Sequence, residues 1–497
     1  MKKLLISALI AGLPGVAMAD AKGDEIAKLK AQLEALQAQM QQLQQAVNAA
    51  TAAKAPEADD ANAELKQRVA GMEMKVDKLT TDASEGPIAG LSITGYMDPT
   101  YVASRLGKSA GFQFVNHSNQ YAYTNSTFGD VYLDIKKTVG VGPTAPSAEI
   151  TILPNRGAGN TLLTSGGGSS SGNNIINTAV ITFPLSDTTQ LVGGLMNSFG
   201  GYEVQQSNQM NTITHGLLYD FSDPGNYVGA GFNWSHDVWA TKFMIANEQF
   251  HTNPNSATDA NGNTHSNSTP TVTGRVDYTM TSNLDIGGSM NIGRQSLYTH
   301  TTTNNNGITS ADGTYGYQGN SNSAYSGYYF GELDLTLTGT DSVYNAEVDY
   351  GRQKQAAWNG GDAVWWGFSL LAHQKWNTET FGRMGATLRY DYLNDSKNGG
   401  GGGGIALGSG TNYGGVDGTN GFGISQACFS ASSSNGTDCS GATRQALTAA
   451  LLFYPTDQLT LKMEYRHDWA NRDVFLRSDG NYRKSNDVLA AQAVYSF

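Results

Sequence analysis

Charged residues recur at every second position in several segments of the chain beyond residue 300. Successive side chains of a β-strand point to opposite faces, so residues two positions apart share a face. Acids occupy two neighbouring segments and bases occupy segments that follow, which predicts an electric field across the space between them. The acids are Glu332, Asp334, Glu347 and Asp349, and the bases are Lys375, Arg383, Arg389, Lys462 and Arg466.

Two interpretations of these charges are open. In the first, each group simply meets solvent or pairs with another charged group. In the second, the groups face a water-filled space and act together on what passes through it. Because acids and bases are nearly balanced in number, the second interpretation predicts passage of small hydrated polar solutes with weak preference between ions.

Common catalytic and metal-binding motifs are absent from the sequence. It contains no HExxH, no Walker-type GKS/T and no CxxC, and its eight histidines lack metal-ligand spacing. Residues 168–172 match G-x-S-x-G, but they lie in a Gly/Ser run without the strand-to-helix turn that this motif needs. We therefore expect no enzymatic activity, no cofactor and no metal. A barrel lipase or esterase stays open as an alternative, because Ser and His on neighbouring strands cannot be paired from sequence.

The charged positions belong to segments with one apolar and one polar face. In the segment 459–469, odd-numbered positions are mostly apolar and even-numbered positions are mostly charged or polar, and the alternation recurs in 272–280, 332–338 and 383–392. Segments of about ten residues with this pattern are typical of transmembrane β-barrels, in which a charge on the lipid face costs about 2–4 kcal/mol near the membrane centre. The alternative is a soluble sheet with one buried face.

Short turns and longer connections alternate between these segments. Short turns lie at 186–188, 339–341 and 455–457, whereas the connection 394–442 is among the long ones. Transmembrane barrels have short connections on one side and long connections on the other. The pattern predicts an all-β transmembrane barrel of about 16 antiparallel strands. The strands are expected near 92–103, 128–139, 147–154, 175–185, 189–198, 226–235, 238–250, 271–280, 283–296, 326–339, 341–354, 362–376, 378–393, 443–454, 458–471 and 486–497.

The chain ends on an alternating segment, 486–497, whose last residue is Phe497. This ending resembles the closing strand of Gram-negative outer-membrane barrels, although a C-terminal strand of a soluble β-sandwich is the alternative. With the strand number and the connection pattern, it makes residues 90–497 similar to the trimeric porins of Gram-negative bacteria. Some porins carry an N-terminal coiled coil, and the chain resembles an uncharacterised proteobacterial porin-like group of that kind. The resemblance implies outer-membrane location, contact with outer-membrane lipid and a homotrimer.

The resemblance also singles out one connection. In porin-like barrels the loop between the fifth and sixth strands folds inward and narrows the pore, and the matching connection here is 199–225. It is unusually apolar for an exposed loop. An extra hairpin on the barrel rim is the alternative. If the loop folds inward, the residues it is expected to present to the channel are Glu203, His215, Asp220 and Asp223.

The first 85 residues have a different composition. Residues 1–19 combine two lysines, an apolar core and an A-x-A sequence, which is typical of a signal peptide. In 20–85, apolar residues at alternating steps of three and four predict a periplasmic coiled coil in two helical pieces, with self-association as the simplest outcome. Contact between the coiled coil and the cell wall is a further expectation. The barrel then occupies 86–497.

Charge and cysteine content limit the partners. The formal net charge is −12, which disfavours nucleic acid as a partner because phosphate binding needs clustered positive charge. Beyond the signal peptide the sequence contains no run of eighteen apolar residues, so it predicts no transmembrane helix there. The only two cysteines, Cys428 and Cys439, lie in one Gly/Ser/Asn-rich segment and predict a local disulfide in an oxidising compartment, with free thiols as the alternative.

These features and the resemblance predict an outer-membrane porin for passive diffusion of small hydrated polar solutes and ions. An outer-membrane adhesin or structural scaffold, whose loops bind a partner, is the main alternative. Channel conductance separates the porin from the adhesin and from the lipase or esterase. An assay with lipid or ester substrates separates those two from each other.

Overall fold

The computed structural model describes residues 89–497 apart from 115–127, 141, 143, 154–174, 250–255, 259–262, 297–300, 304–308, 312–323, 357–360, 398–440, 474 and 480–481. Four predictions lie outside the described residues: the signal peptide, the coiled coil, the disulfide between Cys428 and Cys439, and the Gly/Ser motif at 168–172. Among the described residues, no helix is long and apolar enough to cross a membrane.

The chain divides into two compact units. The first comprises Met1–Ser92 and Lys136–Ala145. Among its described residues, the backbone N–H of Thr138 donates a hydrogen bond to the carbonyl of Gly90 at 2.9 Å. The second comprises Ile93–Ile135 and Pro146–Phe497, and it contains most of the β-sheet and the whole of the site described below.

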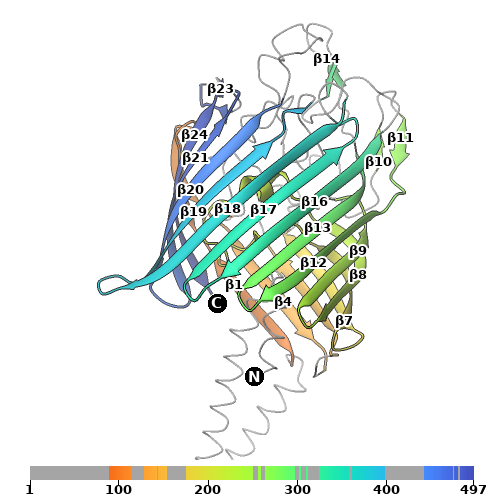
Figure 1. Cartoon of the computed structure of the whole chain (residues 1–497), viewed down its shortest axis with the longest axis horizontal. Helices are drawn as coiled ribbons and strands as arrows, with labels where there is room; N and C mark the ends of the chain where they lie inside the picture. The colour runs from red at the N-terminus through yellow and green to blue at the C-terminus, as the bar shows by residue number, and fades with distance from the viewer. Residues whose placement is uncertain are drawn as a thin grey trace, which may run out of the picture. The chain divides into compact units, whose positions relative to one another are not determined.

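Eighteen strand segments form one sheet, which closes into an antiparallel barrel (Figure 1). β1 (Leu91–Met97) and β2 (Thr100–Ser104) both pair with β24 (Ser485–Ser496), so they follow one another along a single barrel strand. β4 (Val131–Thr138) pairs with β1 and β3 (Ser109–Gln113) pairs with β2, which makes a second barrel strand in two segments. The barrel therefore contains sixteen strands, which confirms the prediction of an all-β barrel of about 16 antiparallel strands.

The remaining fourteen barrel strands are β24 and thirteen further uninterrupted segments. These segments are β5 (Ser147–Ile152), β6 (Ile176–Pro184), β7 (Thr189–Met196), β8 (Tyr227–His236), β9 (Trp239–Ala246), β12 (Thr271–Thr281), β13 (Leu284–Ser296), β16 (Tyr325–Thr338), β17 (Ser342–Gln353), β18 (Ala363–Thr378), β19 (Gly382–Asn394), β20 (Thr443–Tyr454) and β21 (Leu459–Ala470).

Smaller elements lie in the longer connections. Three two-stranded sheets pair β10 (Ser256–Thr258) with β11 (Thr264–Ser266), β14 (Thr301–Thr303) with β15 (Thr309–Ala311), and β22 (Phe475–Leu476) with β23 (Tyr482–Arg483). The short helix α4 (Leu217–Phe221) lies in the connection between β7 and β8.

The alternation of side chains fixes which face of each strand points outward. The outward side chains of Leu333 and Met463 are 68% and 62% exposed, whereas their inward neighbours Glu332 and Lys462 are 3% and 2% exposed. A shift of one residue in register would exchange the two sets. Because such a shift would bury the apolar set and expose the charged set, the two-residue period of the sequence favours the observed register.

The first barrel strand is interrupted between β1 and β2, where a continuous strand over 92–103 was predicted. Pro99 lies in this interruption and cannot donate a ladder hydrogen bond. The Asp98 N–H instead donates to the carbonyl of Asp130 at 3.1 Å. The barrel also closes on the last residue: the N–H of Phe497 donates to the Gly95 carbonyl and the Gly95 N–H donates to the Phe497 carbonyl, both at 2.9 Å.

Candidate channel constriction

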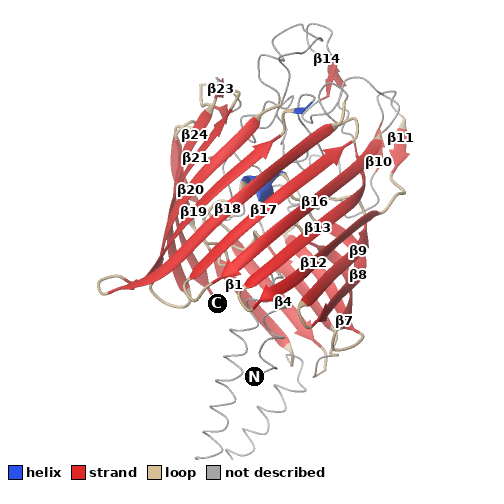
Figure 2. Cartoon of the chain, viewed as in Figure 1, coloured by secondary structure: helices blue, strands red, loops and turns tan. Residues whose placement is uncertain are grey.

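The connection between the fifth and sixth barrel strands, residues 197–226, lies inside the barrel and is called the inner loop below. The Gln206 amide donates to the Tyr132 hydroxyl on β4 at 3.3 Å, and the Asn177 amide on β6 donates to Gln205 at 2.7 Å. Helix α4 of the loop contacts β18 and β19. A single loop reaches strands at these different positions of the circumference only from within. Figure 2 shows α4 within the outline of the barrel strands.

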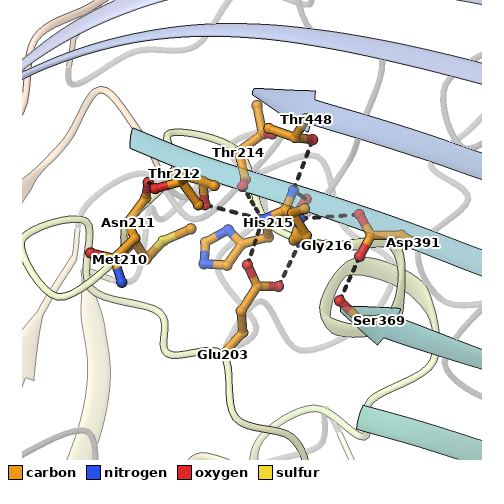
Figure 3. Close-up of polar contacts among 12 residues, drawn as sticks. Glu203, Met210, Asn211, Thr212, Thr214, His215, Gly216, Ser369, Asp391 and Thr448 are labelled. Atoms are coloured by element: carbon orange, nitrogen blue, oxygen red, sulfur yellow. Dashed lines mark hydrogen bonds and ion pairs between the residues drawn. The ribbon is translucent and has the colours of Figure 1, made fainter. Parts of the chain in front are cut away.

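Arg389 on β19 binds the middle of the inner loop, and Figure 3 shows its loop partners Glu203, Thr214 and His215. Its Nη1 lies 2.7 Å from Glu203 Oε1 and donates to the Thr214 carbonyl at 2.8 Å, and its Nη2 donates to the His215 carbonyl at 2.8 Å. Its Nε donates to Asp391 Oδ2 at 3.0 Å. The guanidinium is fully buried. A planar donor group in this arrangement joins the loop to the wall through several charge-assisted hydrogen bonds at once.

Three consecutive inward positions of β21 bind the same stretch of loop. The Lys462 ammonium donates to three loop carbonyls, among them that of Ser207 at 2.7 Å. Glu464 accepts hydrogen bonds from the Thr214 N–H at 3.2 Å and the Thr214 hydroxyl at 2.6 Å. Arg466 donates to the Thr214 hydroxyl at 3.1 Å. The alternating positive and negative side chains thus match the carbonyl and N–H groups of the loop backbone.

Apolar packing also holds the inner loop. Leu217, Leu218 and Phe221 are at most 1% exposed and belong to one buried cluster with Trp365 of β18 and Leu393 of β19. Burying a large apolar side chain contributes about 1.5–3 kcal/mol. These residues made the loop too apolar for an exposed segment, and the barrel interior is the surface on which they pack.

The acidic residues of β16 form ion pairs with a base from another strand. Arg275 on β12 lies 2.6 Å from Asp334 Oδ2 and 3.4 Å from Glu332 Oε2. It reaches them across Gly287 of β13, where an added Cβ would stand 2.0 Å from Arg275 Nη2. Glycine at 287 is therefore what lets the guanidinium pass over the intervening strand.

The acidic residues of β17 meet the inner loop instead. Glu347 and Asp349 are 3% and 1% exposed, and one ligand oxygen of each lies within 4.8 Å of the other and of Asp223. The Tyr202 N–H donates to Glu347 Oε2 at 3.1 Å. The end of the loop that follows α4 therefore contacts β17 through acids on both sides.

Burial shifts the pKa values of the four loop residues predicted to face the channel. It raises the pKa of Glu203 to about 7 although Arg389 opposes the rise, and it raises the pKa of Asp220 to about 8. Burial and the neighbouring Asp349 hold the pKa of Asp223 well above its usual range. Burial lowers the pKa of His215 to about 3, and its Nε2 contacts the Val204 carbonyl at 3.0 Å.

The structure brings three of the five predicted bases together at the loop, namely Arg389, Lys462 and Arg466. It leaves out two. Arg383 is about half exposed, with Nη2 3.8 Å from Asp341 Oδ1, and the Lys375 ammonium stands 5.3 Å from the ring centre of Tyr454. Both belong to the end of the barrel where the β18–β19 turn lies.

The predicted segregation of acids and bases by strand is wrong. Asp391, Glu464 and Asp468 lie among the bases of β19 and β21, and Arg275 serves the acids of β16. The two-residue period could have found the first three, because each shares a face with a predicted base. It places Arg275 on an inward face too, but it could not have found the pairing of Arg275 with Glu332 and Asp334, which lie two strands away.

Comparison with known families gives the chain a place. The sequence model of one family, described as "Protein of unknown function (DUF3138)", matches residues 1–59 and 52–497. The chain belongs to this DUF3138 family. No curated protein matches it.

Solved structures with similar folds include outer-membrane proteins. OmpT, an outer membrane protein of Vibrio cholerae, has a TM-score of 0.48 and 6% identity, over 82% of this chain and 97% of its own. An anion-selective porin from Comamonas acidovorans has a TM-score of 0.46 and 10% identity, over 82% of this chain and 99% of its own. Salmonella typhi OmpF in complex with daunomycin has a TM-score of 0.47 and 9% identity, over 82% of this chain and 97% of its own. At these scores and identities, the function of the DUF3138 barrel has to be argued from its own residues.

Proposed function

We propose that this DUF3138 protein is an outer-membrane channel for passive diffusion of small hydrated polar solutes and ions, with the inner loop as its constriction. One observation carries the proposal: a closed sixteen-stranded barrel holds a loop inside it through buried charged residues, while its outward side chains are apolar. A barrel of this size is too wide for wall side chains alone to fill. A loop bound to the wall narrows the barrel interior but does not have to fill it.

The charge distribution supports weak preference between ions. Arg389, Lys462 and Arg466 direct their donors to loop carbonyls and to carboxylates, so they offer little free positive charge to a passing anion. Glu332 and Asp334 are likewise paired with Arg275. Selectivity then rests on size and hydration. Residues Glu203, His215, Asp220 and Asp223 act in this proposal by shaping the loop.

The outward face supports a lipid environment, because large apolar side chains such as Ile181, Leu333 and Met463 are more than 60% exposed on it. Exposed apolar surface of this extent needs a cover. Outer-membrane lipid supplies it around most of the barrel in this proposal, and neighbouring copies supply it in a homotrimer.

Conductance across a planar lipid bilayer tests the proposed function. Purified full-length protein added to one side is expected to give discrete current steps in potassium chloride, with similar permeability for both ions. The absence of steps would refute the channel. Selective binding of cells or envelope components by a non-conducting barrel would then favour the adhesin or scaffold, and turnover of an ester or phospholipid would favour the lipase or esterase.

A further inference from the structure

Three carboxylates converge where the inner loop returns to the barrel wall. Asp223 follows α4 in the loop, and Glu347 and Asp349 occupy neighbouring inward positions of β17. One oxygen of each lies within 4.8 Å of the others. The three residues are 9%, 3% and 1% exposed. Carboxylates rarely come this close in a buried position without something to balance their charge.

Among the residues that the structure describes, no base balances the charge of this cluster. Among the described residues, no Arg, Lys or His forms an ion pair with Asp223, Glu347 or Asp349, whereas the neighbouring acids of β16 have Arg275. Neither oxygen of Asp223 has a hydrogen-bond partner among the described residues, and Glu347 Oε1 has none either. These buried oxygens belong to residues whose ligand atoms lie within 4.8 Å of one another. Fully buried and unpartnered carboxylate oxygens are costly unless a cation binds them or protons neutralise them.

The donor set selects the kind of cation. All three ligands are carboxylates, and the fully buried Ser222 hydroxyl lies beside Asp349 as a further oxygen. Ca²⁺ takes about six to eight oxygen ligands in flexible geometry and accepts carboxylates in bidentate form. Mg²⁺ demands octahedral geometry and keeps several waters, which a buried cluster accommodates poorly. Zn²⁺ prefers sites with nitrogen or sulfur ligands.

The backbone of the loop comes close to the same point. Gly201 has φ of +71°, and a Cβ added there would stand 2.8 Å from Asp223 Oδ2 and 3.0 Å from Glu347 Oε2. The Tyr202 N–H already donates to that Glu347 oxygen at 3.1 Å. Both ends of the inner loop therefore meet at the cluster, one through residues 201–202 and the other through 222–223.

We propose that Asp223, Glu347 and Asp349 bind one Ca²⁺, which fastens the ends of the inner loop to β17. The ion joins Asp223 of the loop to Glu347 and Asp349 of the wall. Removing calcium therefore removes this attachment of the loop to β17. The site complements Arg389 and the β21 residues, which hold the middle of the loop. The calcium site is tested by ion binding alone, independently of whether the barrel conducts.

Calorimetric titration of Ca²⁺ into the folded full-length protein, after chelator treatment and dialysis at pH 7.5, tests the site. One Ca²⁺ per chain is expected, with Mg²⁺ binding at least about tenfold more weakly. A second probe locates the ion: Tb³⁺ excited through aromatic side chains should emit, because the Tyr328 hydroxyl lies near Asp223 and Asp349, and Ca²⁺ should displace that emission. No Ca²⁺ binding would overturn the proposal and would mean that protons neutralise the cluster.

Variants decide whether the ion occupies this cluster. Asp223→Asn and Asp349→Asn are each expected to weaken Ca²⁺ binding at least about tenfold. Asp277→Asn is the matched control, since Asp277 is a lumen-side carboxylate paired with Arg275 at 2.7 Å, and it should bind Ca²⁺ as the unaltered protein does. Undiminished binding in both cluster variants, or equal binding of Mg²⁺, would overturn the proposal. If Asp349→Asn fails to fold, Asp223→Asn in the loop and the Tb³⁺ emission decide.

Discussion

Replacing Arg389 by Gln should release the middle of the inner loop from the barrel wall. The substitution removes the ion pair with Glu203 at 2.7 Å and the hydrogen bonds to the carbonyls of Thr214 and His215. It also leaves the buried carboxylates of Glu203 and Asp391 without their guanidinium partner. The pairing of β19 with β18 and β20 is made by the backbone and should persist.

The size of the effect follows from breaking a buried ion pair, which typically costs about 3–5 kcal/mol because the remaining charge stays buried. With tenfold per about 1.4 kcal/mol, the population of released loop should rise by about a thousandfold. The Arg389→Gln channel should therefore show larger or noisier current steps than the unaltered protein. Proteolysis offers a second readout, because a protease cleaves the loop only when the loop leaves the barrel interior.

Chymotrypsin suits this readout, since the inner loop contains Tyr202, Leu217 and Phe221 but no Lys or Arg. Fragments mapped by mass spectrometry should show faster cleavage at these residues in Arg389→Gln. The control is Arg383→Gln, because Arg383 is about half exposed and lies 3.8 Å from Asp341, and the loop should stay protected. Both variants should keep the heat-dependent gel shift of a folded barrel. Unchanged loop cleavage and unchanged current in folded Arg389→Gln would refute the role assigned to Arg389.

Three further predictions concern pH, packing and barrel closure. The free energy that holds the inner loop against the wall should weaken by on the order of 1–2 kcal/mol between pH 7 and 8.5. In the docked loop, Glu203 and Asp220 have pKa values of about 7 and 8, against ordinary values of 4.5 and 3.8. Docking therefore takes up protons, and the docked state loses stability as pH rises. Chymotrypsin cleavage of the loop, corrected for protease activity on a peptide, should increase over this range, and Glu203→Gln should reduce the increase; a flat profile in the unaltered protein would contradict the reasoning. Gly287→Ala should lower barrel stability by about 1–3 kcal/mol, because its Cβ would meet Arg275 at 2.0 Å, whereas Gly331→Ala meets nothing within 4 Å; equal denaturant midpoints for the two would count against this. Deleting Phe497 should lower the yield of folded barrel by removing two hydrogen bonds to Gly95 while leaving the predicted coiled coil folded, as measured by the gel shift and by helical circular dichroism, and an unchanged yield would argue against closure through this residue.

The sequence by itself determined the barrel and the facing of its side chains. Each strand has a two-residue period, so Lys462 and Arg466 had to share a face opposite Met463. The charged face was predicted to point inward because charge is costly in lipid, and the structure has it inward. Alternating connection lengths determined the number of strands. The interruption at Pro99 was also within reach, because proline removes a ladder donor, but the segment was predicted as continuous.

Only the tertiary structure decided what the inward residues do. Lys462 and Thr212 are 250 positions apart in the chain, and Arg275 meets Asp334 by crossing a strand that has glycine at 287. Strand period fixes the direction of a side chain but not its partner across the barrel, because the partner depends on the path of the loop. The same reason hid the meeting of Asp223 with Glu347 and Asp349. Residues expected to line a pore thus became the residues that hold the loop.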